Sequence, residues 1–189
     1  MCRARVNRWP VGSRRRSEAV FLSRTLLNKP VSNEHILQVG AWLGQEAKAR
    51  EIVARFDADL AALAAKKPDG LRVALYGPNG YTTGTGTLAD DILSAAGLQN
   101  IAADAGIPGG GTLPLERLVL LHPDILVSSN PYPGYSQAEA VLNHPAIRAI
   151  PTLKEDDRSD DASWGCETPH ILNAVREMRA LAERTEAQE

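Results

Sequence analysis

The feature that most constrains this fold is a long stretch, from about residue 33 to residue 66, in which apolar residues recur with helical spacing. They follow one another at three-, four- and five-residue steps: Ile36, Val39, Leu43, Ala47, Ile52, Phe56, Leu60 and Leu63. This periodicity predicts one long amphipathic helix, weakened near Gly40 and Gly44. At 1.5 Å per residue it would be about 50 Å long, which exceeds the width of the domain it enters. We therefore expect it to lie against a second body.

Beyond Pro68, which ends this helix, short apolar segments alternate with amphipathic ones. The pattern predicts strands at 72–76, 124–128 and 150–153, and helices at 88–96, 115–122, 137–142 and 169–182. Such alternation is typical of βαβ units. The predicted fold is therefore an α/β lobe at about 70–185, with three layers and a parallel sheet, preceded by the long helix. Thr87 and Asp90 form a capping-box-like pattern that places a helix start at Leu88.

The first thirty residues differ in composition from the rest. They hold eight Lys or Arg residues and one Glu, whereas the whole chain has 21 basic and 23 acidic residues. We interpret 1–30 as a basic segment that is disordered or not native to the protein, because it lacks the continuous apolar core of an export signal. The near-neutral total gives no general field for nucleic acid. Apolar runs of about 20 residues, which a membrane span needs, are absent.

Four of the nine aromatic residues fall in loops expected at the carboxyl ends of the strands, where open parallel sheets bind ligands. They are Tyr81, Tyr132, Tyr135 and Trp164. Together they could offer a flat, amphipathic surface to a bulky conjugated or cyclic ligand. The alternative is that each of them covers the end of a helix.

Other chemistries have weaker support in the sequence. The glycine-rich loop 77–87 lacks both the lysine of a P-loop and the third glycine of a dinucleotide fingerprint. The four histidines are scattered, and Cys2 and Cys166 form neither a C-x-x-C pair nor a zinc spacing. Two alternatives stay open: an intracellular enzyme that binds a phosphorylated small molecule through Gly77–Thr87, with Asp90 or Asp91 as acid or base, and a basic-arm protein using Arg14, Arg15 and Arg16.

Four segments in order carry a resemblance to a known family. They read Tyr-Thr-Thr-Gly-Thr-Gly-Thr-Leu at 81–88, Ala-Ala-Gly-Leu-Gln-Asn-Ile-Ala at 95–102, Leu-Glu-Arg-Leu at 115–118 with His-Pro-Asp-Ile-Leu-Val at 122–127, and Leu-Asn-His-Pro-Ala-Ile at 142–147. This set resembles the C-terminal lobe of periplasmic binding proteins that serve ABC importers of iron-siderophores, haem and cobalamin. In that family one long, stiff helix joins two α/β lobes. The resemblance therefore implies an interlobe helix at 33–67 and one lobe of a bilobal protein, truncated by loss of the N-terminal lobe.

The resemblance also implies roles for individual residues. Glu116 matches the exposed glutamate that pairs with an arginine of the membrane permease, and the expected ligand-facing residues are Tyr81, Thr82, Tyr132, Tyr135 and Trp164. The expected partners are an ABC permease with its ATPase in the inner membrane and a small chelate ligand, which can itself contain a metal. The resemblance further implies a monomeric, periplasmic binding protein without catalytic residues, resident cofactor, nucleic-acid partner or membrane span.

Overall fold

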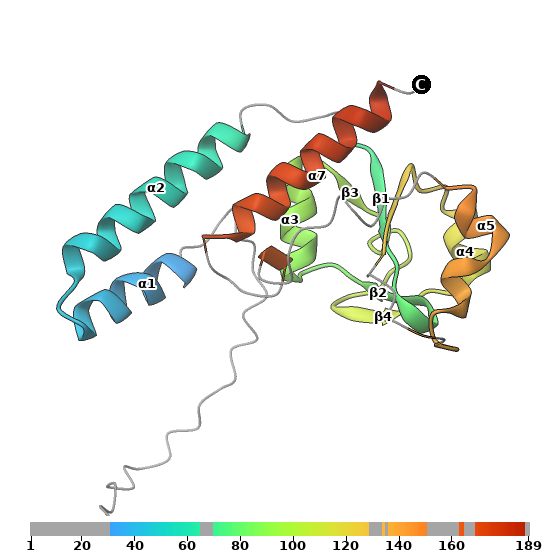
Figure 1. The fold of residues 1–189 in the computed structure, drawn as a ribbon, viewed down its shortest axis with the longest axis horizontal. Helices are drawn as coiled ribbons and strands as arrows, with labels where there is room; N and C mark the ends of the chain where they lie inside the picture. Colours follow the sequence, from blue (N-terminus) through green and yellow to red (C-terminus); the bar gives the residue numbers. More distant parts are fainter. Residues whose placement is uncertain are drawn as a thin grey trace, which may run out of the picture.

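A three-stranded parallel sheet lies at the centre of the lobe (Figure 1). Its strands β1 (Arg72–Leu75), β3 (Gln99–Asn100) and β5 (Ile125–Val127) are arranged in the order β3-β1-β5. The register pairs Val73 of the central strand with Asn100 on one side and Ile125 on the other. The computed structural model describes residues 31–64, 70–128, 134, 136–150, 163–164 and 169–187.

Side-chain alternation along β1 builds two hydrophobic clusters, one on each face of the sheet. Val73 and Leu75 join the first cluster, whereas Ala74 and the following Tyr76 join the second. The first face is covered by α2 (Glu46–Ala64), α3 (Leu88–Ala96) and α7 (Ile171–Glu186). The second face is covered by α4 (Leu115–Leu120), the 3₁₀ turn η2 (Ala140–Asn143) and α5 (Pro145–Arg148). The predicted three-layer α/β lobe is confirmed.

The long amphipathic segment forms two helices, so the prediction of one continuous helix is wrong. The first helix α1 (Val31–Trp42) folds back on α2 as an antiparallel hairpin (Figure 1). Gly44 turns the chain with φ of +63°, a conformation that favours glycine. Gly40 lets the helices approach closely, because a Cβ there would overlap the Cβ of Ala49. A side chain of α1 also donates to α2, from Asn33 Nδ2 to Asp57 Oδ1 over 2.9 Å.

The hairpin removes the reason for expecting a second body that was based on the length of one continuous helix. Because α1 packs along α2, the segment does not require a second body on grounds of its extent alone. The hairpin nevertheless leaves four large apolar side chains exposed: Leu37, Val39, Trp42 and Leu43. The placement of the helical segment 33–67 between two lobes, after a segment at 1–30 and before a lobe at 70–185, stays a prediction, although the segment forms two helices and not one.

Two predicted helix boundaries are confirmed with their mechanism. Thr87 caps α3 by accepting from the backbone N–H of Asp90 over 3.2 Å. The helix α4 ends at Leu120, and His122 before Pro123 takes a left-handed φ of +48°, which stops the helical backbone. The segment predicted as a helix at 137–142 forms only the turn η2, and the helix predicted at 169–182 is α7. The strand predicted at 150–153 lies outside the described residues except for Ile150.

Three short strands were not predicted from the sequence. They are β3 and the antiparallel pair formed by β2 (Tyr81–Thr83) and β4 (Gly110–Thr112). Strands of two or three residues carry too little alternation to be recognised, and the sequence of β4 is mostly glycine. The ribbon of β2 and β4 lies beyond one end of the central sheet (Figure 1).

Candidate functional site

The candidate site lies at the edge where the carboxyl ends of β1 and β5 meet. After β1 the chain enters the 3₁₀ turn η1 (Pro78–Gly80) and then β2. An isolated bridge between Tyr76 and Thr82 ties the ribbon of β2 and β4 to the end of β1. Parallel sheets bind ligands at this edge, so the exposed side chains of the ribbon are the first candidates.

Tyr81 is the aromatic residue that the structure presents most openly at this edge, with 54% of its surface exposed. Its ring leans diagonally across β4 and lies over Gly110, where an added Cβ would come within 3.0 Å of Tyr81 Cζ. The phenol end of the side chain therefore lies over the backbone of Gly110, and more than half of the residue stays exposed. An aromatic ring held in this way can stack on a flat ligand.

The side chain of Thr82, an expected ligand-facing residue, is buried. Strand alternation turns its side chain inward, and only 1% of the residue is exposed. Its neighbour Thr83 is tied down through its carbonyl oxygen, which accepts from Asn100 Nδ2 over 3.0 Å. Thr82 is thus buried, whereas its neighbour Tyr81 is exposed.

The other predicted aromatic residues do not extend this surface within the described part of the chain. Trp164 is half-buried and packs against the hydrophobic cluster that includes Phe56, Val175 and Met178. The ligand-facing role expected for Trp164 stays a prediction. Tyr132 and Tyr135 lie outside the described residues.

The backbone of the glycine-rich loop is already occupied by hydrogen bonds. Six of its N–H groups donate to protein oxygens, namely those of Gly77, Asn79, Gly80, Gly84, Thr85 and Gly86. A phosphate cradle needs such N–H groups unpaired. Asp90 is occupied as well, because its carboxylate accepts from Gly86 N–H over 3.0 Å and from Asn100 Nδ2 over 3.1 Å. The geometry argues against the phosphate-binding enzyme.

The glycines of this loop serve close backbone contact. A Cβ on Gly84 would overlap the carbonyl oxygen of Ile107, and it would lie 3.0 Å from that of Gly109. The N–H of Gly84 donates to Gly109. The Gly-Thr-Gly sequence that suggested a ligand loop therefore joins two segments of the protein.

Glu116 lies on α4 and is exposed to solvent. The middle of the helix is tied to the lobe by Arg117, whose Nη2 donates to the Ala105 carbonyl over 3.1 Å, and its C-terminal cap is tied by Arg72, whose Nη2 donates to the Leu121 carbonyl over 2.8 Å. Beneath it, burial and the negative charge of Glu116 raise the pKa of the Tyr76 hydroxyl. Glu116 is thus a surface carboxylate on a helix that is tied to the lobe, on the face of the sheet that α4 covers.

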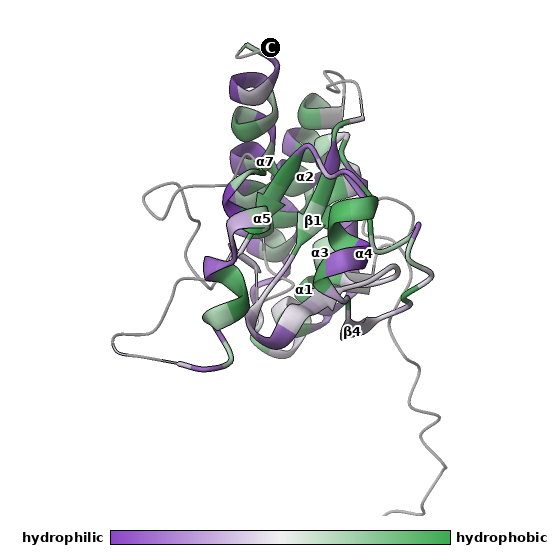
Figure 2. Ribbon diagram, turned by 90° about the vertical axis from the view of Figure 1, so that its right-hand side faces the viewer, coloured by the Kyte–Doolittle hydropathy of each residue, from purple (hydrophilic) through white to green (hydrophobic). Residues whose placement is uncertain are grey.

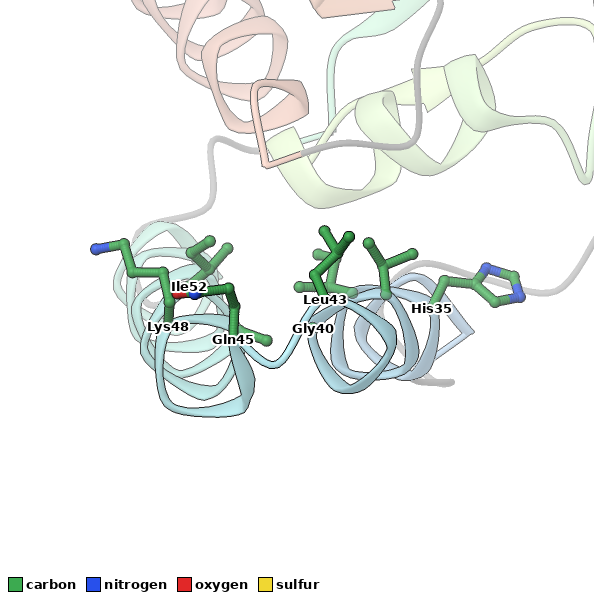
Figure 3. Close-up of a pocket in the computed structure, with 9 residues that line it drawn as sticks. His35, Gly40, Leu43, Gln45, Lys48 and Ile52 are labelled. Atoms are coloured by element: carbon green, nitrogen blue, oxygen red, sulfur yellow. The ribbon is translucent and has the colours of Figure 1, made fainter.

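Sequence reasoning missed an apolar groove on the helical hairpin. It has a volume of about 420 Å³ and is lined by residues of both helices and of the turn between them: His35, Ile36, Val39, Gly40, Leu43, Gln45, Lys48, Ala49 and Ile52. Figure 3 shows Leu43 and Ile52 on the same side of the hairpin. The only sequence signal for this groove was the apolar periodicity of the segment. The same periodicity is expected for one long helix and for two helices in a hairpin.

Two classes of site find no support within the described ranges. No three His, Cys, Asp or Glu side chains there cluster as metal ligands. None of the helices in that part of the chain combines the length and the apolar character that a bilayer span requires.

Comparison with known proteins gives a family match and a set of similar folds. A family model described as "Periplasmic binding protein" matches residues 19–162 of the 189 residues. No curated protein is significantly similar in sequence.

Similar solved structures include the periplasmic heme-binding protein RhuT from Roseiflexus sp. RS-1 in apo form. It has 22% identity and a TM-score of 0.61, over 81% of this chain and 62% of that one. An ABC-type Fe3+-hydroxamate transport system from Saccharomonospora viridis DSM 43017 has 24% identity and a TM-score of 0.55, over 79% and 54%. The periplasmic vitamin B12 binding protein BtuF of Vibrio cholerae has 16% identity and a TM-score of 0.55, over 87% and 64%. These matches concern the fold, and the chain spans less than two thirds of each structure.

Proposed function

The chain belongs to the periplasmic binding protein family, and from that premise we propose that it is a substrate-binding component of an ABC importer. That family consists of binding proteins and not of enzymes. The proposed cargo is an iron-siderophore, haem or cobalamin-type chelate. The proposed place of action is the periplasm, where the chain delivers its ligand to a permease and the associated ATPase.

The observation that carries this proposal is the exposed Tyr81 ring at the carboxyl edge of the sheet. The phenol end of its side chain lies over Gly110, and 54% of the residue stays exposed. Chelates of these three classes are large and present conjugated or apolar surface, which an amphipathic aromatic ring can contact. We propose that the ligand contacts Tyr81 while a second lobe covers its other side. Glu116 is proposed to orient the lobe on the permease through an ion pair with a permease arginine.

Titration with three probes tests the ligand proposal: haemin, a ferric hydroxamate siderophore and cyanocobalamin. Because a second lobe would supply the other part of the contacts, we expect one of them to bind this chain alone only weakly. We expect Tyr81→Ala to weaken that binding by a further factor of roughly five to ten, because a stacked aromatic contributes about 0.5–1.5 kcal/mol beyond its buried area. Leu37→Ala is the control, since it removes an exposed apolar side chain that lies on the helical hairpin, away from the candidate site. Binding of none of the probes, or equal losses in both variants, would contradict the proposal.

A further inference from the structure

Two exposed aliphatic residues share the outer face of α4 with Glu116. Leu120 is 74% exposed and Val119 is 39% exposed. They follow Glu116 by four and three positions, the spacing that places side chains side by side on a helix. Outside the hairpin, these two and Tyr81 are the large apolar side chains that the described residues expose. The carboxylate therefore lies within a small apolar patch formed by Val119 and Leu120.

The patch is rigidly mounted. Leu118, on the opposite side of α4, is fully buried in the cluster that contains Ala74 and Leu126. The hydrogen bonds from Arg117 to Ala105 and from Arg72 to Leu121 tie the middle and the C-terminal cap of the helix to the lobe. Figure 2 shows α4 standing at the surface of the lobe, with hydrophobic and hydrophilic residues in one short helix. The apolar side chains are consequently held in an exposed position before any partner arrives, which lowers the entropic cost of docking.

The negative charge of Glu116 indicates which class of partner the patch can bind. Glu116 forms no ion pair with any residue that the structure describes. A second copy of the chain, docked face to face, would bring two Glu116 carboxylates together near the symmetry axis. An anionic lipid surface would repel the same carboxylate. A protein that presents a cation next to an apolar surface fits both parts of the patch.

We propose that Val119 and Leu120 are the apolar anchor of the permease-docking surface, an inference that rests on the function proposed above. Burial of Leu120 against the permease supplies affinity, and the two aliphatic side chains exclude water from the ion pair of Glu116. The ion pair sets the orientation, and exclusion of water strengthens it by lowering the local dielectric constant. The permease surface is expected to present an apolar pocket or ridge directly beside its arginine.

Photo-crosslinking in native membranes identifies the partner. In one variant Leu120 is replaced by benzoylphenylalanine. In the control the same replacement is made at Leu37, another exposed leucine. We expect a covalent adduct with an ABC-importer permease, identified by mass spectrometry, from position 120 and not from position 37. An adduct with lipid or with a second copy of this chain, or the absence of an adduct at 120, overturns the proposal.

Affinity for that permease–ATPase complex in lipid nanodiscs supplies the second measurement. We expect Leu120→Ser to weaken binding by about tenfold or more and Leu37→Ser to change it by less than about twofold. Val119→Thr is a milder second variant, and melting temperatures check that all variants are folded. If Glu116→Gln weakens docking while Leu120→Ser matches its control, the apolar anchor is wrong and the proposed function stands. If the unchanged chain does not bind the complex, the proposed function fails as well.

Discussion

The ring of Tyr81 lies across Gly110 at a distance that leaves no room for a Cβ atom. Tyr81 pairs in register with Thr112, so the ring reaches diagonally over the neighbouring strand and not over its direct partner. The absence of a side chain at residue 110 thus decides where the most exposed aromatic ring of the candidate site can lie.

Gly110→Ala should displace the Tyr81 ring and reduce ligand affinity with little loss of stability. The added methyl group meets the far end of an exposed side chain, which can move without unfolding the ribbon. We expect a loss of affinity similar to that of Tyr81→Ala, measured by titration with whichever chelate binds. In a Tyr81→Ala background the same change should have no further effect on affinity, and an additive loss would refute the contact.

Gly84→Ala should destabilise the lobe by about 1–3 kcal/mol, because the methyl group overlaps backbone atoms that cannot move independently. Gly77→Ala is the control. Its φ of −112° suits any residue, and a Cβ there would lie 3.6 Å from the Tyr81 carbonyl oxygen. Urea denaturation gives the free energy of unfolding for both variants. Equal free energies of unfolding for the two variants would show that Gly84 is not tightly packed against residues 107–109.

Gly40→Leu should open the helical hairpin, because even a single methyl group at residue 40 overlaps Ala49. Amide hydrogens of α1 are then expected to exchange with solvent about tenfold faster or more, measured by hydrogen–deuterium exchange with mass spectrometry. Ala41→Leu adds the same bulk at an exposed position of α1 and should leave exchange unchanged. Unchanged protection in Gly40→Leu would mean that the two helices do not cross at this glycine.

Alkaline pH should destabilise the protein through Tyr76. Burial, and secondly the charge of Glu116, raise the pKa of its hydroxyl above the ordinary value of 10.0. Above that pH the unfolded chain loses this proton while the folded protein retains it, so the free energy of unfolding falls as pH rises beyond about 10. This contribution is intact at lower pH.

Two variants isolate that contribution. Glu116→Gln removes the charge but not the burial, so it should reduce the alkaline loss of stability in part. Tyr76→Phe should remove it entirely, although it changes the stability at neutral pH as well. Urea denaturation between about pH 8 and pH 11 measures the slope for each protein. An identical slope in all three would exclude Tyr76 as its source.

Local signals accounted for the elements that the sequence predicted well. The helix at Leu88 begins where Thr87 supplies a cap, and it ends before Gly97, which has a left-handed φ of +86°. The strands β1 and β5 follow from apolar runs between turn-forming residues. These features depend on neighbours a few residues apart, which a sequence displays directly.

The candidate site was less predictable because its geometry depends on pairing between distant segments. Tyr81 and Thr82 are adjacent aromatic and polar residues of one loop, yet their exposure is opposite once β2 pairs with β4. Trp164 lies in a predicted ligand loop, yet it covers the core. The sequence alone could not distinguish these outcomes, since β4 carries almost no pattern of its own.

The sequence by itself determined the α/β lobe, its parallel sheet and the helical character of 33–66, because hydrophobic periodicity and capping act over a few residues. Only the tertiary structure decided that this helical stretch folds back at Gly44, that Tyr81 is exposed over Gly110, and that Leu120 accompanies Glu116 on an open face. The physical reason is that each of these depends on close contact, or on its absence, between groups whose neighbours are set by the packing of the whole chain.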